Sequence, residues 1–176
     1  MEARENQDHT IADIEALPEG ERAELIHGAL YYMAAPSRRH QRLVTDIATA
    51  VNHYIKDNSG NCEVNVSPFA VFLNADDKTY VEPDIVVVCD SDKLTDEGCN
   101  GAPDWIIEVV SPSSRQMDYM RKLFLYRSAG VREYWIVDPD DLLITVYNFE
   151  NETMEKYSFG QAVPAGIYEG FDIKVV

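Results

Sequence analysis

The feature that most constrains the fold is a run of four apolar residues, Ile85 to Val88, which follows a carboxylate at Asp84. A strand that is apolar on both faces belongs in the middle of a sheet that is covered on both sides. A second run, from Trp105 to Val110, is apolar throughout except for Glu108. Together the two runs predict a central sheet with a further layer of structure on each face.

Helices and strands are expected to alternate around this sheet. In chain order, the patterns first predict a short helix with Ile11, Ile14 and Leu17, two short strands around a turn at His27-Gly28, and a helix from Ser37 to about Asn58. The apolar stripe of this last helix consists of Leu43, Val44, Ile47, Val51 and Ile55. Strands over about 62–73, 80–89 and 104–110 follow, then a helix ended by Gly130, a strand over 133–137, and a hairpin of 142–149 with 153–159. This order indicates an α/β (mixed α+β) fold. We expect residues 1–10 to form a flexible tail and residues 11–176 to form one domain.

The helix before Gly130 carries the residues that matter most for chemistry. Its stripe of Met117, Met120, Leu123 and Phe124, with Ser128 as a further candidate, is expected to face the sheet. Asp118 and Lys122 are four residues apart and share a helix face. Glu108 lies roughly 7 Å before the end of its strand. If the following helix runs back along the sheet, it covers that distance, and comes level with Glu108, at about residues 118–122. The side chain of Lys122 is then long enough to point its ammonium at a metal site formed by the carboxylates of the two strands, and the alternative is a surface ion pair with Asp118.

The excess of acidic over basic residues restricts which partners the chain can bind. Fifteen basic and 31 acidic residues give a net charge of −16, which argues against a surface that holds nucleic acid by bulk electrostatics. More than half of the bases fall in two clusters, which allows either one positive side or two ordinary solvated helix faces. These clusters are Arg38, Arg39 and Arg42, and Arg115, Arg121, Lys122, Arg127 and Arg132.

The location and the cysteine chemistry follow from simpler signals. No apolar run approaches the roughly 20 residues of a membrane span, and the N-terminus is too polar for a signal peptide, so a cytoplasmic location is expected. Cys62, Cys89 and Cys99 share no metal-ligand spacing, and they indicate neither a zinc site nor a disulfide framework. Cys89 is expected to be a small core residue.

Asp84 and Glu108 occupy positions where the pattern of a buried strand predicts apolar residues. A buried unpaired carboxylate is costly, so each one needs a cation, a metal ion or a proton. Two such acids on adjacent strands form an oxygen-rich site that suits Mg²⁺ or Mn²⁺. The alternative is that Asp84 caps a loop while Glu108 pairs with an arginine.

Six short motifs occur in an order and spacing that resemble the Uma-type restriction endonuclease family, a prokaryotic branch of the PD-(D/E)xK nuclease superfamily. The resemblance extends from about residue 11 to residue 150. It implies a restriction-endonuclease-like core with a central mixed β-sheet flanked by helices, here with an added β-hairpin. The motifs are Glu24-Leu-Ile-His-Gly, Arg39-His40-Gln41, Glu82-Pro83-Asp84, Ile107-Glu108-Val-Val-Ser-Pro-Ser-Ser114, Asp118-x-x-x-Lys122 and Tyr134-Trp-Ile-Val-Asp-Pro139.

The resemblance also implies roles for individual residues. Pro83-Asp84 matches the PD element, and Glu108 matches the second acid of the superfamily. The usual lysine is replaced by Val110, and Lys122 fits a lysine that has moved to the following helix. Asp84 and Glu108 would then hold Mg²⁺, with Mn²⁺ as a substitute, and Lys122 would orient water or stabilise charge on phosphate oxygens. Glu24 would bind a second metal ion or position the water.

The expected activity is Mg²⁺-dependent hydrolysis of DNA by an endonuclease. Two alternatives stay open, a non-catalytic interaction or regulatory protein on the same fold and a metal-dependent hydrolase of a small phosphate compound. A dimer is expected if the hairpin aromatics Tyr147, Phe149, Tyr157 and Phe159 form an interface, although they are also suited to the core. The residues expected to contact the DNA backbone are Arg38, Arg39, His40, Arg42, Arg115 and Arg121.

Overall fold

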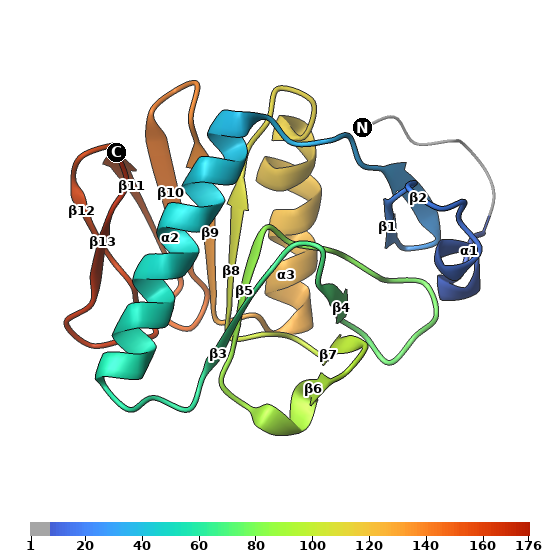
Figure 1. Cartoon of the computed structure of the whole chain (residues 1–176), viewed down its shortest axis with the longest axis horizontal. Coiled ribbons are helices and arrows are strands. Elements are labelled where there is room, and N and C mark those ends of the chain that lie inside the picture. The colour runs from blue at the N-terminus through green and yellow to red at the C-terminus, as the bar shows by residue number, and fades with distance from the viewer. Residues whose placement is uncertain (1–7) are drawn as a thin grey trace.

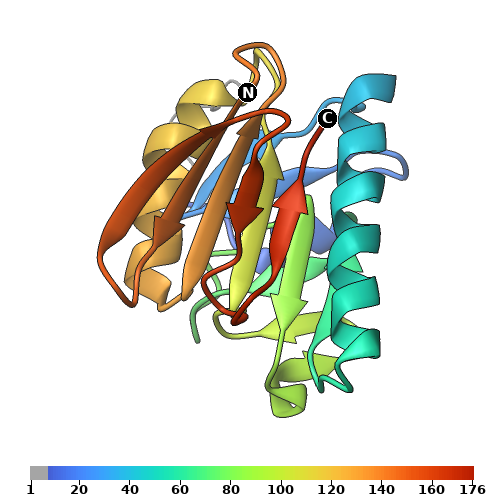
Figure 2. The same cartoon turned by 90° about the vertical axis from the view of Figure 1, so that its left-hand side faces the viewer.

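The computed structural model describes residues 8–176 and has a six-stranded mixed sheet at its centre. Figure 2 shows the sheet between two helical layers, which confirms the predicted α+β architecture. Strands β8 and β9 are parallel, and the other neighbours are antiparallel. The strands, in order across the sheet, are β11 (Thr153–Ser158), β10 (Leu143–Asn148), β9 (Glu133–Asp138), β8 (Trp105–Val109), β5 (Ile85–Val88) and β3 (Glu63–Val66).

One face of the sheet is covered by α2 (Arg38–Asp57) and by the C-terminal ribbon of β12 (Ala162–Pro164) and β13 (Asp172–Lys174) (Figures 1 and 2). The hydroxyl of Ser37 caps α2 by accepting a hydrogen bond from the backbone N–H of His40 at 3.2 Å. The predicted apolar stripe is buried against the sheet, because its spacing keeps it on one side of the helix. Its members are Leu43, Val44, Ile47, Val51 and Ile55.

The opposite face is covered by η2 (Met117–Lys122), a π-helical turn that continues into α3 (Leu123–Ala129). As predicted, α3 ends at Gly130, whose φ of 94° favours glycine. A small sheet lies beside these helices and consists of β4 (Ala70–Phe72), β6 (Leu94–Thr95) and β7 (Gly98–Asn100), with the short helix η1 (Ser91–Lys93) before β6.

The N-terminal segment forms its own small unit beside the main sheet (Figure 1). It contains α1 (Ile11–Glu15), β1 (Ala23–Ile26) and β2 (Ala29–Tyr32), and a bridge between Leu25 and Tyr80 joins it to the rest of the chain. The N–H of His9 donates to the carbonyl of Gly28 at 3.0 Å, so the described end of the expected tail is attached. Residues 1–7 of that tail lie outside the described residues.

The predicted inner face of the third helix is only partly correct. Met117 is buried and Leu123 is partly buried against the core, as expected. Met120 and Phe124 are 63% and 71% exposed, and Ser128 is exposed as well, whereas Asp118 and Lys122 are buried. A π-helical turn holds an extra residue relative to an α-helical turn and shifts the positions that face inward. Ion pairs at Lys122, described below, compensate the cost of burying its charge.

Two of the predicted strands are also shorter or divided. The run over 62–73 forms β3 and β4, which belong to different sheets and are separated at Ser67-Pro68, where proline cannot donate to a ladder. Of the strand predicted over 80–89, only β5 belongs to the central sheet. Tyr80 instead makes an isolated bridge to the N-terminal unit, and Val81 makes one to β4.

The expectation of no disulfide is contradicted as well, since Cys62 and Cys89 are bonded. The register of β3 and β5 pairs Glu63 with Val88, and the two cysteines directly extend that pairing. A cross-strand pair of this kind depends on register rather than on local spacing. Cys99 is a free, buried cysteine.

The predicted C-terminal hairpin is present as β10 and β11. Its aromatic residues are half-buried on both faces of the sheet. Tyr147 and Phe149 contact the core on the α3 side, and Tyr157 and Phe159 contact the core on the α2 side. In the part of the chain from residue 8 onward, no helix is long and apolar enough to cross a bilayer.

Glu133 on β9 is a buried carboxylate on the α2 side of the sheet. The indole N–H of Trp135 donates to its Oε1 at 2.5 Å, and any side chain at Gly166 would collide with its Oε2. Burial raises the pKa of Glu133 to about 7. The folded protein therefore holds this proton more tightly than the unfolded chain does. The resulting contribution to the free energy of unfolding is present at acidic pH and is lost as the pH rises through about 7.

We therefore predict that Glu133→Gln stabilises the protein relative to wild type at pH 8 but not at pH 4.5. The difference in unfolding free energy should grow by roughly 2–3 kcal/mol across that range. Urea unfolding at several pH values measures it, with Glu169→Gln at an exposed position as the control. An equal effect of Glu133→Gln at both pH values would contradict the assignment.

Candidate active site

The ammonium of Lys122 lies at the centre of the site and bridges two carboxylates from distant parts of the chain. Its Nζ is 2.8 Å from Glu24 Oε2 on β1 and 2.8 Å from Glu108 Oε1 on β8. Asp118 Oδ1, on the same π-helical turn, is 3.8 Å away. The Lys122 residue is only 3% exposed, which contradicts the alternative of a surface ion pair with Asp118.

The strand register places the second carboxylate beside Glu108. Ile85 pairs with Ile107 in the antiparallel β5–β8 ladder, so the next pair along is Asp84 and Glu108. The N–H of Asp84 donates to Glu108 Oε2 at 3.3 Å, and the N–H of Val109 donates to Asp84 Oδ2 at 2.8 Å. Residues opposite each other in a ladder project from the same face, which brings the two carboxylates together.

The helix contributes a residue that the sequence analysis missed. The hydroxyl of Tyr126 donates to Glu108 Oε1 at 2.9 Å and is fully buried. Tyr126 follows Lys122 by four residues and Asp118 by eight, so the three form a polar stripe at helical spacing. That spacing is a signal that could have been detected in the sequence.

The electrostatics of the site keep Lys122 charged. Burial by itself lowers the pKa of Lys122, but Glu108, Glu24 and Asp118 raise it well above the ordinary value. Burial raises the pKa of Glu108 well above its usual range and that of Asp118 to about 6, although Lys122 opposes both shifts. One ammonium therefore faces more acids than it can neutralise, and a further cation or a proton is favourable here.

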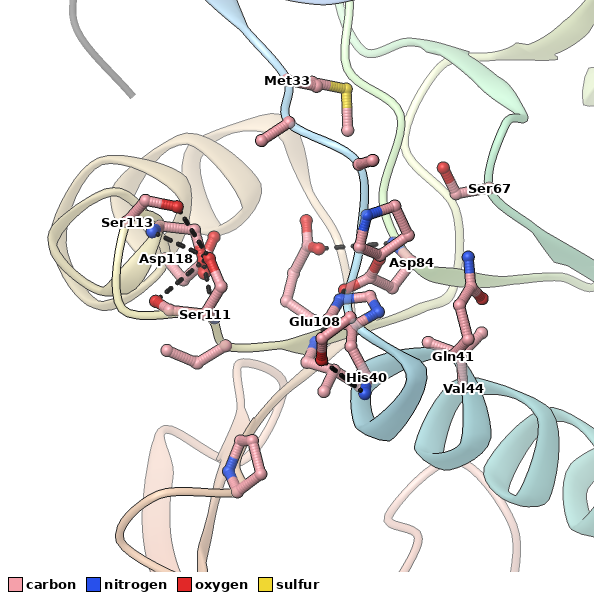
Figure 3. A pocket seen from close by; sticks show the side chains of 18 of the residues that line it. Met33, His40, Gln41, Val44, Ser67, Asp84, Glu108, Ser111, Ser113 and Asp118 are labelled. Carbon is pink, nitrogen blue, oxygen red and sulfur yellow. Dashed lines mark hydrogen bonds and ion pairs between the residues drawn. The ribbon is translucent and has the colours of Figure 1, made fainter.

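A pocket of about 370 Å³ opens onto Asp84 and Glu108. In Figure 3, Asp84, Glu108 and His40 gather on one side of the pocket, while Asp118 and Ser111 line the other. His40 Nε2 is 3.0 Å from Asp84 Oδ2. Burial lowers the pKa of His40, but the hydrogen bond and charge of Asp84 raise it overall.

Most of the arginines predicted to contact DNA are not at this pocket. Of the six basic residues, only Arg39 and His40 line it. Arg39 is hydrogen-bonded to the carbonyl of Pro139. The others lie elsewhere, and most face partners within the protein. Arg38 is exposed, Arg42 pairs with Asp46 at 3.5 Å, Arg115 pairs with Asp138 at 2.7 Å and with Asp141 at 2.8 Å, and Arg121 lies 5.3 Å from the centre of the Tyr31 ring.

A different arginine, Arg22, does line the pocket and was also missed. Its Nε donates to Glu82 Oε2 at 2.8 Å, and its Nη2 donates to Ser67 Oγ at 2.7 Å. The hydroxyl of Tyr80 donates to Glu82 Oε1 at 2.6 Å, and the N–H of Glu82 donates to Glu24 Oε1 at 3.0 Å. Arg22 precedes Glu24 by two residues, but no local pattern distinguishes it from a solvated arginine.

The residues of the site fit a hard divalent cation by the chemistry of their donors. Within residues 8–176, no group of three or more histidine, cysteine or acidic side chains is arranged to hold a metal ion. Asp84 and Glu108 supply two carboxylates on one wall of the pocket. Mg²⁺ is commonly held by one or two carboxylates, with water and substrate phosphate completing its shell.

The fold and the site define the class of protein as restriction-endonuclease-like. The structure is similar to a crystal structure from Anabaena variabilis that is described as "a putative nuclease belonging to DUF820". The TM-score is 0.73 at 21% sequence identity, with 90% of this chain and 89% of that chain covered. This likeness shows the fold.

The family follows from the sequence, because residues 11–174 match the model of the Uma2 family, described as "Putative restriction endonuclease". The chain belongs to this family, which confirms the resemblance found in its motifs. Two Synechocystis proteins are also similar, "Uncharacterized protein sll1609" at 29% identity over 121 residues and "Uncharacterized protein slr1290" at 25% over 129 residues. The alignments cover 67% and 73% of this chain and 67% and 66% of those proteins.

We predict that Lys122→Met destabilises the fold strongly at pH 8. The change leaves Glu24 and Glu108 buried without their shared cation, a situation that costs about 3–5 kcal/mol. Urea unfolding measures the loss, and Lys56→Met at an exposed position of α2 serves as the control. Adding Glu24→Gln should recover part of the loss. A Lys122→Met variant as stable as the control would show that the bridge contributes nothing.

Proposed function

We propose that this chain is a divalent-cation-dependent nuclease that hydrolyses phosphodiester bonds in DNA. The observation that carries the proposal is the convergence of Asp84, Glu108 and the charged Lys122 at one pocket. Family membership and the fold support the same class of reaction.

Asp84 and Glu108 would hold Mg²⁺, or Mn²⁺ in its place. When bound, such a cation polarises the scissile phosphate and increases the acidity of a water molecule. The protein orients Asp84 through the Val109 N–H and His40, and it orients Glu108 through Lys122 and Tyr126. Side chains fixed in this way lose little freedom when a ligand arrives.

Lys122 acts as a fixed positive charge rather than as a base, because its neighbours raise its pKa well above the ordinary value. In this role it stabilises negative charge that develops on the phosphate oxygens. Glu24 is fully buried and accepts hydrogen bonds from Lys122 and from the Glu82 N–H. These contacts favour Glu24 as a positioning residue for Lys122 over the expected role in binding a second metal ion.

A second candidate function is hydrolysis of a small phosphate compound. The observation in its favour is the confined pocket of about 370 Å³, within the size range of small-molecule sites. The scarcity of unpaired arginines around the pocket points the same way. The two candidates differ in how binding depends on salt.

We predict that Asp84→Asn removes Mg²⁺ binding and reduces cleavage at least about 100-fold, because the site loses half of its paired charge. Isothermal titration with Mg²⁺ and Mn²⁺ measures binding, and a labelled oligonucleotide measures cleavage. Asp46→Asn, at an exposed position of α2, is the matched control. Unchanged metal binding and cleavage in a folded Asp84→Asn protein would refute the role of Asp84.

Binding to DNA should weaken as salt rises, but only gently. Arg22 and Arg39 are the arginines that line the pocket. Two phosphate contacts predict a slope of about −1.8 for a duplex and about −1.4 for a single strand in a plot of log affinity against log salt. Fluorescence anisotropy with a labelled oligonucleotide measures this slope. Cleavage of small phosphate esters without any salt-dependent binding of DNA would favour the second candidate instead.

A further inference from the structure

A second cavity, which we call the flanking cavity, adjoins the active-site pocket. It has a volume of about 460 Å³ and lies among α1, β1, β4 and the segment around Tyr80. Arg22 and Glu82 line both the pocket and the flanking cavity. The Arg22–Glu82 pair is therefore a wall that the two spaces share.

Arg22 has hydrogen-bond donors to spare on this wall. Glu82 and Ser67 fix the guanidinium through Nε and Nη2, while Nη1 makes no hydrogen bond to any described residue. The side chain is 37% exposed. By contrast, Lys122 is buried among carboxylates and Arg39 is engaged by Pro139 and Asp140. Arg22 is thus the pocket cation best placed to receive a phosphate.

The flanking cavity itself suits a planar organic group rather than a phosphate. Phe72 and Tyr80 line it with their rings 5.5 Å apart in an edge-to-face arrangement, and Ile14 and Leu17 add apolar surface. Aromatic rings provide stacking platforms for nucleobases. The cavity also carries three exposed acids that would repel a phosphate but accept hydrogen bonds from base amino groups. These acids are Glu15, Glu21 and Glu97.

We propose that the flanking cavity binds the base of an unpaired nucleotide next to the scissile phosphodiester, and that Arg22 holds the phosphate that joins the two positions. The proposal rests on the proposed function, because it takes the Asp84–Glu108 pocket as the place of cleavage. The substrate would then be a nucleic acid with an unpaired nucleotide, as in a single strand, at a chain end or after a nucleotide has been flipped out of a duplex.

The burial of the reacting groups supports an unpaired substrate. The side chains of Glu108 and Lys122 are only 6% and 4% exposed, so the phosphodiester must enter the pocket to reach them. A base inside the flanking cavity would at the same time be removed from any duplex stack. Unstacking costs least in a strand that is already single.

The test compares nucleotides with a base-free probe. Binding of dAMP, dCMP and 2-deoxyribose 5-phosphate is measured by isothermal titration in a buffer with Mg²⁺. Wild type should bind the nucleotides about 5- to 150-fold more tightly than the sugar phosphate, as expected for one base stacked on an aromatic ring. Phe72→Leu should remove most of this preference, whereas Arg22→Gln should weaken all three probes by a similar factor.

The control variant is Phe124→Leu, which removes a ring that is exposed on α3, away from both cavities. It should leave all three affinities unchanged. Circular dichroism and the unfolding midpoint show whether Phe72→Leu is folded, and Tyr80→Leu provides a second variant of the same cavity. Equal binding of nucleotides and sugar phosphate by wild type would overturn the proposal, as would a full base preference in both folded cavity variants.

Cleavage assays with one sequence as a single strand and as a duplex separate this inference from the proposed function. Cleavage of both forms at equal rates, with no base preference, would refute the flanking cavity as a base site and leave the nuclease assignment intact. Base-dependent binding without cleavage of either form would support the base site and refute the nuclease assignment.

Discussion

The rest of this structure depends on one buried ammonium. An isolated charge in a protein interior is strongly unfavourable, so Lys122 is retained only because Glu24, Glu108 and Asp118 surround it. The first two acids lie on β1 and β8, and the lysine lies on η2. One interaction therefore joins the N-terminal unit, the central sheet and the helical layer, and it fixes the distance between them.

This interaction also bears on the proposal that the lysine of the site has moved to the helix. Glu108 and Val110 both face the η2–α3 layer, and Val110 is buried in the apolar core there. A lysine at position 110 would place its charge in that core, whereas Lys122 approaches Glu108 from the helix across the same interface. The π-helical turn directs both Asp118 and Lys122 inward. Irregular turns of this type occur frequently at functional sites.

The sequence predicted the parts of the fold that depend on local pattern. The doubly apolar strand at Ile85–Val88 and the stripe of α2 are buried as expected, because in both elements the local apolar pattern sets which residues face the core. The motifs likewise identified the acids and the lysine that meet at the pocket. The disulfide of Cys62 with Cys89 depends on register between strands that are distant in sequence, so no local pattern reveals it.

The error in the third helix has a different physical origin. The expected inner stripe of the third helix included Met120 and Phe124, because apolar residues normally face a core. Here the free energy of a charge network outweighs that preference, and the polar residues turn inward. The contacts of the arginines with DNA stay a prediction, although some of these charges are engaged by acids that are close only in space. Arg115, for example, is engaged by Asp138 and Asp141.

The acidic character of the chain has a consequence for how the proposed site binds its ligands. Five acids line the pocket, against three permanently charged bases and one histidine, so the pocket by itself repels a phosphodiester. A divalent cation on Asp84 and Glu108 would remove that repulsion, and a bound phosphate would in turn provide ligands for the cation. By thermodynamic reciprocity, each must raise the affinity of the other by the same factor. A net charge of −16 is therefore compatible with a nuclease whose affinity for nucleic acid comes from the occupied site rather than from its surface.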